Sequence, residues 1–135
     1  MQTLKTIAVA AVLGIAASGT ALAAETCSQK SFAGVWMVSS TAPSLCLFEL
    51  NSKGDITESR CYLGANFATP NGSLSGKLSV SSSCKITGTV TEAAGKKKIK
   101  WSISATGSPS PVGNVIEGTA KAGKNTAMLA GWQQW

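Results

Sequence analysis

Apolar or small side chains alternate with polar ones in three successive stretches of the chain, 74–80, 84–91 and 98–105. In the stretch 97–106, for example, Ile99, Trp101 and Ile103 alternate with lysine and serine. A period of two residues is that of a β-strand that buries one face and exposes the other to water. After Ala23 no segment carries the sustained 3.6-residue period of a helix, and only residues 25–32 could form a short helical turn. The sequence therefore predicts an all-β domain.

The same alternation, interrupted by turn residues, divides the chain into eight predicted strands: 34–39, 45–51, 55–62, 73–80, 84–92, 97–106, 114–121 and 127–132. Tight reversals are expected at 51–54, 94–95 and 122–125, and longer loops at 64–72 and 107–113. Eight short strands joined in sequence most simply form a small antiparallel meander that closes into an eight-stranded up-and-down (calycin-like) barrel, since closure removes exposed edges. A two-sheet β-sandwich is the alternative.

The N-terminus has the pattern of a secretory signal peptide over residues 1–23. A short start with Lys5 precedes an apolar run over residues 7–17, and Ala21-Leu22-Ala23 forms a small-x-small cleavage site. The apolar run is shorter than the roughly 20 residues that a membrane span needs. We expect cleavage after Ala23, a single domain over residues 24–135, and a periplasmic or secreted protein. The short, alanine-rich leader is typical of bacteria.

All four cysteines follow the leader, and no two of them have C-x-x-C spacing. An even number in an exported chain predicts structural disulfides rather than metal or redox chemistry. We predict that Cys46 pairs with Cys61 and Cys27 with Cys84. A two-residue turn at 53–54 would place Cys46 opposite Cys61, whereas a bulge turn at Gly54 would slip the register by one. The spacing thus allows this pairing without requiring it.

Histidine is absent from the sequence, which removes the Ser-His-Asp and Cys-His catalytic groups and the commonest general base. The six carboxylates are scattered, and we expect them on solvated strand faces. They are Glu25, Glu49, Asp55, Glu58, Glu92 and Glu117. We therefore expect no enzymatic activity, no metal site and no cofactor.

The chain is basic, with a formal net charge of +6, but Arg60 is its only arginine. Nucleic-acid sites favour arginine and interleaved aromatic residues, so we expect no nucleic-acid partner. The dense cluster of Lys96, Lys97, Lys98 and Lys100 could contact an anionic surface or polysaccharide. Lysines at a turn or strand edge also commonly prevent association between sheets.

Aromatic residues mark the first strand and the C-terminus. Gly34-Val35-Trp36 has a Gly-x-Trp pattern in which glycine turns the chain into the strand and tryptophan plugs one end of a barrel. The C-terminal Trp132-Gln133-Gln134-Trp135 invites comparison with outer-membrane barrels, but outward faces of Lys, Ser and Thr predict that this barrel is not inserted in a membrane.

The predicted core comprises Trp36, Phe48, Leu50, Leu78, Ile86, Val90, Ile99, Trp101 and Ile103.

Residues 32–62 carry a G-V-W motif at 34–36, a C-L-F-E-L-N motif at 46–51, and then Cys61. This order of a G-x-W strand, a C-x-x-x-L-N strand and a second cysteine resembles the opening of the Inh-type periplasmic inhibitors of serralysin-class metalloproteases. The resemblance implies a compact eight-stranded barrel and an exported metalloprotease as partner. In that family the N-terminal segment enters the protease cleft. The corresponding contact residues here are Ala24, Glu25, Thr26, Ser28, Gln29 and Lys30.

Two functional interpretations remain open for what we expect to be a monomer. One is a protease inhibitor that acts through the N-terminal arm and adjacent loops. The other is a non-catalytic binding or structural module for a small apolar ligand or an anionic surface glycan. Eight-stranded barrels are just wide enough to be filled by side chains or to hold one small ligand, and we expect a filled interior. An apolar pocket of several hundred Å³ would favour the ligand-binding module.

Overall fold

The computed structural model describes residues 26–64, 67–110 and 113–134. These residues form eight β-strands and no helix. The strands are β1 (Gly34–Ser40), β2 (Ser44–Leu50), β3 (Ile56–Leu63), β4 (Ser73–Val80), β5 (Lys85–Ala94), β6 (Lys97–Ser108), β7 (Val115–Ala122) and β8 (Asn125–Gln133). Every predicted strand is present, and each of its ends lies within two residues of the prediction.

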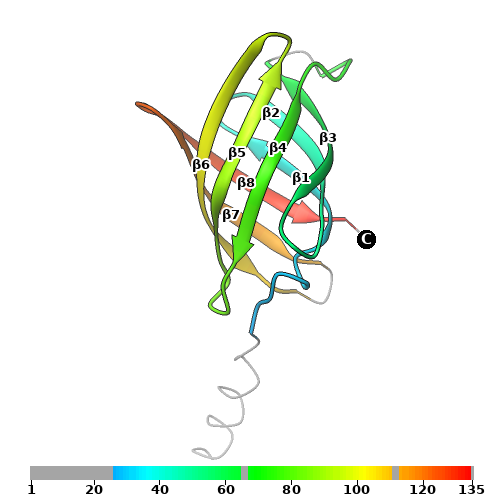
Figure 1. Ribbon diagram of the computed structural model, residues 1–135, viewed down its shortest axis with the longest axis vertical. Helices are drawn as coiled ribbons and strands as arrows, with labels where there is room; N and C mark the ends of the chain where they lie inside the picture. The colour runs from blue at the N-terminus through cyan, green and yellow to red at the C-terminus, as the bar shows by residue number, and fades with distance from the viewer. Residues whose placement is uncertain (1–25, 65–66, 111–112, 135) are drawn as a thin grey trace, which may run out of the picture.

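The strands form one antiparallel sheet in the order β3-β2-β1-β8-β7-β6-β5-β4, which curls into a nearly closed barrel (Figure 1). Neighbours in the chain are neighbours in the sheet, and the first strand also pairs with the last, as in Met37 opposite Trp132. The up-and-down barrel is therefore confirmed, and the sandwich alternative is not adopted.

Closure between β3 and β4 rests on a few individual hydrogen bonds instead of a continuous ladder. The Leu78 amide donates to the Gly54 carbonyl at 2.8 Å, and the Cys61 amide donates to the Gly72 carbonyl at 2.8 Å. Between them, the Ser59 hydroxyl donates to the Leu74 carbonyl and accepts from the Leu74 amide, both at 2.7 Å. A side chain thus bridges the gap where the two backbones diverge.

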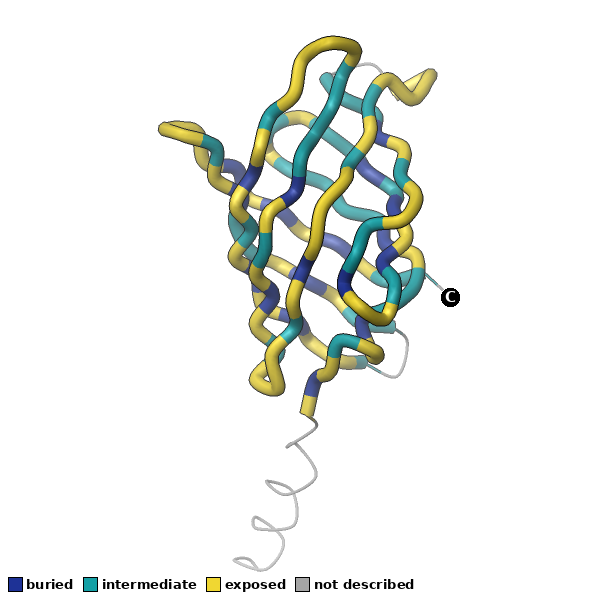
Figure 2. Tube along the Cα trace, viewed as in Figure 1, coloured by how far each residue is buried: buried dark blue, intermediate teal, exposed yellow. Residues whose placement is uncertain are grey.

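The core occupies the barrel interior, and inward and outward residues alternate along the strands (Figure 2). Seven of the nine predicted core residues are buried, whereas Ile99 and Ile103 are half-buried and pack against the core. Two interior cavities are small, at about 70 Å³ and 10 Å³. Side chains therefore fill most of the barrel interior, as expected.

The segment before β1 is irregular. The expected helical turn over 25–32 is not formed in its described part, where residues 29–32 make simple turns. The segment is held to the barrel by long-range contacts, described below, which replace helical hydrogen bonds. Gly34 then enters β1 with a φ of 131°, a conformation that side chains other than glycine rarely adopt. This agrees with the predicted role of the Gly-x-Trp motif.

Candidate functional site

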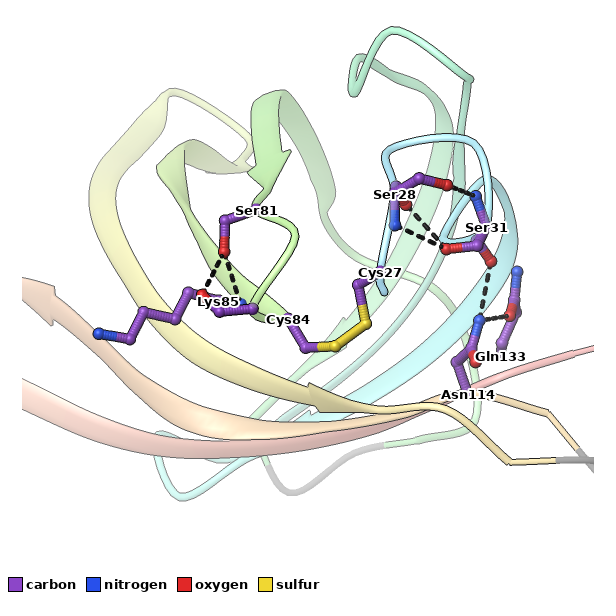
Figure 3. Close-up of a disulfide and its surroundings, with 9 residues drawn as sticks. Cys27, Ser28, Ser31, Ser81, Cys84, Lys85, Asn114 and Gln133 are labelled. Carbon is purple, nitrogen blue, oxygen red and sulfur yellow. Dashed lines mark hydrogen bonds between the residues drawn. A yellow bond between two sulfur atoms is a disulfide. The ribbon is translucent and has the colours of Figure 1, made fainter. Parts of the chain in front are cut away.

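One end of the barrel is closed by residues 26–33, and we call it the plugged end. A disulfide joins Cys27 to Cys84 in the β4–β5 turn, with 5.1 Å between the Cα atoms (Figure 3). The Cys27 amide also donates to the Ser82 carbonyl at 3.3 Å. Cys27 itself is buried, whereas Thr26 is exposed. The predicted Cys27–Cys84 pairing is confirmed, and it fixes the start of the described chain on the barrel.

Gln29 attaches the same segment to β4. Its side-chain Nε2 donates to the Leu78 carbonyl, and its Oε1 accepts from the Val80 amide, both at 3.0 Å. The amide side chain thus takes the place of a neighbouring strand at the end of β4. Of the predicted contact residues, Gln29 is therefore engaged in holding the fold together.

Phe32 is the plug. Its ring is 1% exposed and stacks on Trp36, with centroids 5.6 Å apart and planes inclined by 10°. The Trp36 indole N–H donates to the Phe32 carbonyl at 2.8 Å, so that both aromatic residues are fixed. Gly107 on β6 makes room for the ring, since a Cβ atom there would lie 2.4 Å from Phe32 Cζ. Trp36 closes the barrel end as predicted, but together with a phenylalanine from outside the strands.

Polar side chains complete the plugged end on the β7–β8 side. Asn114 Nδ2 donates to the Ser31 carbonyl at 2.8 Å and to Gln133 Oε1 at 2.7 Å (Figure 3). Gln133 Nε2 in turn donates to the Ala33 carbonyl at 2.6 Å. Ser28 and Ser31 bond to each other through reciprocal amide–hydroxyl contacts of 3.1 Å. The segment is thereby attached to strands on both sides of the barrel.

The remaining predicted contact residues divide into two groups. Thr26, Ser28 and Lys30 are exposed at the plugged end. Ala24 and Glu25 lie outside the described residues, as does the predicted signal peptide. The exposed set is the part of this end that can meet a partner without disturbing the plug.

The predicted lysine cluster lies at the opposite end of the barrel, on the β5–β6 hairpin (Figure 1). Lys96, Lys97, Lys98 and Lys100 are all exposed. The fold therefore separates the two surfaces that the sequence singled out, and they cannot form one site. We call the end with the turns 41–43, 95–96 and 123–124 the distal end.

The second disulfide, between Cys46 and Cys61, also matches the predicted pairing. Both sulfurs belong to buried residues on the inner face of β2 and β3. Two disulfides indicate an oxidising, extracellular type of compartment. Within the described ranges, no group of three or more His, Cys, Asp or Glu could hold a metal ion, and no helix is long and apolar enough to cross a membrane.

Glu92 contradicts the expectation that the carboxylates lie on solvated faces. It shares the inner face of β5 with Ile86 and Val90, and it lines the 70 Å³ cavity near the distal end. Burial raises the pKa of its carboxyl, and the Trp101 indole and the Lys97 charge oppose that rise. Ile86 and Val90 were predicted in the core, and the same alternation extended by two residues would have placed Glu92 inside as well.

The outer surface is also more varied than predicted. Lys, Ser and Thr dominate the outside of β4–β6, but exposed apolar residues occupy the outside of β7, β8 and β1. Trp132 is 45% exposed and stands opposite Met37 on β1 and Val115 on β7. The expected uniformly polar exterior is therefore wrong for these three strands, where Val35, Val115, Met128 and Trp132 are exposed.

Comparison with known proteins yields no match to this chain among family models, curated proteins or solved structures. The geometry therefore consists of a disulfide-stapled barrel with a fixed N-terminal segment at one end and a small, mainly apolar cavity near the other.

Proposed function

We propose that this protein is an exported protease inhibitor that uses the barrel as a scaffold. The contact surface comprises Ala24–Lys30 together with the neighbouring turn 81–84. The partner is an exported metalloprotease, as the G-x-W and C-x-x-x-L-N motifs suggest. The observation that carries the proposal is the disulfide at Cys27, which attaches this segment to the rim of the plugged end.

Pre-organisation is the physical reason why such an attachment favours inhibition. A segment that is already attached to the barrel at Cys27 loses less conformational entropy on binding than a free segment does. If cleavage follows Ala23, three residues precede Cys27, and three extended residues reach about 10 Å. That length is sufficient to enter a protease cleft while the barrel rests on its rim.

The nearly filled interior supports a scaffold more than a carrier of large ligands. Pockets for drug-sized ligands measure roughly 300–1,000 Å³. The larger interior cavity measures about 70 Å³. A sizeable apolar ligand therefore has no room within the described barrel.

The test compares the mature chain with a variant that lacks Ala24 and Glu25. We expect the intact protein to inhibit a zinc protease exported by the same organism, and the deletion to weaken inhibition by at least about 30-fold. The melting temperature should stay nearly unchanged, because the deletion precedes the buried Cys27. Failure of the intact protein to inhibit any such metalloprotease at micromolar concentration would refute the proposal.

The matched control removes charge at the distal end. Substituting Lys97, Lys98 and Lys100 by Ser should leave inhibition intact, because these lysines begin β6 at the β5–β6 hairpin, which lies at the other end of the barrel (Figure 1). The same variant tests a second candidate function, the binding of an anionic polysaccharide, which the exposure of all three lysines favours. Under that alternative, the variant would lose affinity for the polysaccharide, and salt would weaken the parent's binding.

A further inference from the structure

We propose that a groove on the outer side of β7 and β8 binds an extended segment of a partner protein that carries an arginine between apolar side chains. We define the β7–β8 groove by Val115, Glu117, Met128, Ala130 and Trp132, which alternate with inward residues and point out of the barrel. The groove follows the side wall of the barrel, and its residues are not part of the proposed inhibitory contact at the plugged end.

Two hollows on the outer wall join to form the β7–β8 groove. One measures about 520 Å³ and reaches Met128, and the other measures about 300 Å³ and reaches Val115 and Trp132. Glu117 and Ala130 line both hollows, which are therefore continuous. The short side chain of Ala130 accounts for the shape, because it stands between Met128 and Trp132 at the outward positions of β8.

The walls of the groove are apolar although they face solvent. Met128 is 66% exposed, and Val115 and Trp132 are each 45% exposed. Met37 on β1 stands opposite Trp132 and continues the apolar surface beyond the groove. Contiguous apolar surface on a soluble protein commonly marks a site of contact with another molecule. The groove is therefore a candidate docking surface.

Glu117 determines the charge of the partner. It is exposed where the two hollows meet, and among the described residues no hydrogen bond or ion pair engages its side chain. Of the described residues that line the two hollows, Glu117 alone is charged. An unpaired carboxylate between apolar walls favours a cationic side chain and repels an anionic lipid surface. A two-fold contact with a second copy, centred on this groove, would bring two Glu117 carboxylates together.

Trp132 favours arginine over lysine as that cation. In the β7–β8 ladder Val115 stands opposite Trp132 and Glu117 opposite Ala130, so Trp132 is a diagonal neighbour of Glu117. A guanidinium group can donate two parallel hydrogen bonds to a carboxylate and can also stack on an indole ring. An ammonium group meets the carboxylate as a point charge and lacks the planar face.

The spacing of outward residues fixes the positions of the partner's apolar side chains. Successive outward residues of a strand lie about 6.6–6.8 Å apart, and an extended peptide has the same repeat. An arginine above Ala130 therefore places the residues two positions before and after it in the hollows at Met128 and at Val115. The recognised sequence is apolar-x-Arg-x-apolar.

The experiment uses the peptide acetyl-Leu-Ser-Arg-Ser-Leu-amide and follows the indole N–H resonances of the disulfide-bonded mature protein at low ionic strength. The Trp132 signal should shift and saturate with a dissociation constant on the order of millimolar, since a pentapeptide covers little surface. Trp36 provides an internal control, because its indole N–H is bonded to the Phe32 carbonyl at the plugged end. Added salt should weaken binding, because the charges are exposed.

Two altered peptides test the central position of the motif. Replacing the arginine by glutamate should weaken binding at least about tenfold, because the new carboxylate faces Glu117. Replacing it by lysine should weaken binding about twofold to threefold, because the stacking on Trp132 and the paired hydrogen bonds are lost. Equal or tighter binding of either peptide would overturn the proposal.

Three variants of the protein assign the contact to the groove. Glu117→Gln should weaken binding about threefold, as expected for an exposed ion pair. Glu58→Gln removes the same charge at an exposed site of β3, outside the groove, and should leave binding unchanged. Trp132→Ala should weaken binding about fivefold or more, measured on the leucine methyl resonances of the peptide. An equal loss of affinity in Glu58→Gln and Glu117→Gln would contradict the assignment.

The other possible occupants of the groove are tested with the protein alone and with vesicles. Absence of a saturable Trp132 shift up to about 20 mM peptide, on the order of twenty times the expected constant, would overturn the proposal. Self-association that Trp132→Ala abolishes would show that a second copy occupies the groove. Binding to phosphatidylglycerol vesicles that Trp132→Ala abolishes would show that a membrane surface does. Either result would also overturn the proposal.

Discussion

Cys46 lies directly opposite Cys61 in the β2–β3 ladder, with 4.1 Å between their Cα atoms. The turn after β2 pairs Leu50 with Ile56, a register that alone would leave the two cysteines one residue out of step. An irregularity between Glu49 and Leu50 shifts the pairing, so that Glu49 meets Glu58. A β-bulge therefore restores the register that the disulfide requires.

The two disulfides should stabilise the barrel unequally. Replacing both Cys46 and Cys61 by Ala should lower the free energy of unfolding by about 3 kcal/mol, and replacing Cys27 and Cys84 by about 4 kcal/mol. The difference follows from sequence separations of 15 and 57 residues, since a longer closed loop restricts the unfolded chain more. Urea unfolding of both double variants measures this order, and the reverse order would contradict it. Peptides that link Cys27 to Cys46 or Cys61 would disprove the pairing.

Strand positions could be predicted from the sequence because burial of one sheet face imposes a period of two on the chain. The Gly54 turn was equally predictable, since its φ of 90° is a conformation that glycine adopts readily. The bulge that corrects the register after that turn could not be predicted, because no residue type specifies it. The sequence therefore allowed the Cys46–Cys61 pairing but did not demand it.

The plugged end shows where local patterns lose their predictive power. Gln29 bonds to Leu78 across a separation of 49 residues, and Asn114 bonds to Ser31 across 83. Neither contact leaves a periodic signal, because each depends on how the closed barrel brings distant segments together. Glu92 was missed for a different reason, because a charged residue was assigned to solvent against the parity of its own strand.

The packing of Phe32 at the plugged end should be disturbed by a Cβ atom added at Gly107. Phe32→Ala should lower the free energy of unfolding by about 3–5 kcal/mol through loss of a buried ring. Gly107→Ala should cost about 1–3 kcal/mol, because its Cβ would lie 2.4 Å from Phe32 Cζ. In the Phe32→Ala background the Gly107 substitution should cost almost nothing. Denaturant unfolding of the full cycle tests this coupling, and strict additivity would show that the two residues do not contact each other.

Substitutions of Trp101 and Trp132 compare a buried tryptophan with an exposed one and so test which strand positions face the core. Trp101→Ala should cost about 3–5 kcal/mol, because the side chain is 9% exposed in the core. Trp132→Ala should cost less than about 1 kcal/mol, since that residue is 45% exposed. Thermal and urea unfolding measure both. A loss below about 1 kcal/mol for Trp101 would reverse the parity assigned to β6.

The Glu92 carboxyl should contribute more to the stability of the barrel in mild acid than at neutral pH. Burial raises the pKa of its carboxyl above the ordinary value of 4.5, so the folded state binds the proton more tightly than the unfolded state. The contribution of Glu92 to stability is then largest below that ordinary pKa. It declines as the pH rises from there through the raised pKa of the folded state.

Glu92→Gln removes this dependence while retaining the shape of the side chain. The variant should be more stable than the parent above the raised pKa, and the advantage should shrink as the pH falls toward 4.5. Glu117→Gln, at an exposed site on β7, provides the control for loss of a negative charge. Urea unfolding across this pH range measures the three curves. Parallel curves for the parent and Glu92→Gln would show that the Glu92 carboxyl is solvated as an ordinary surface group.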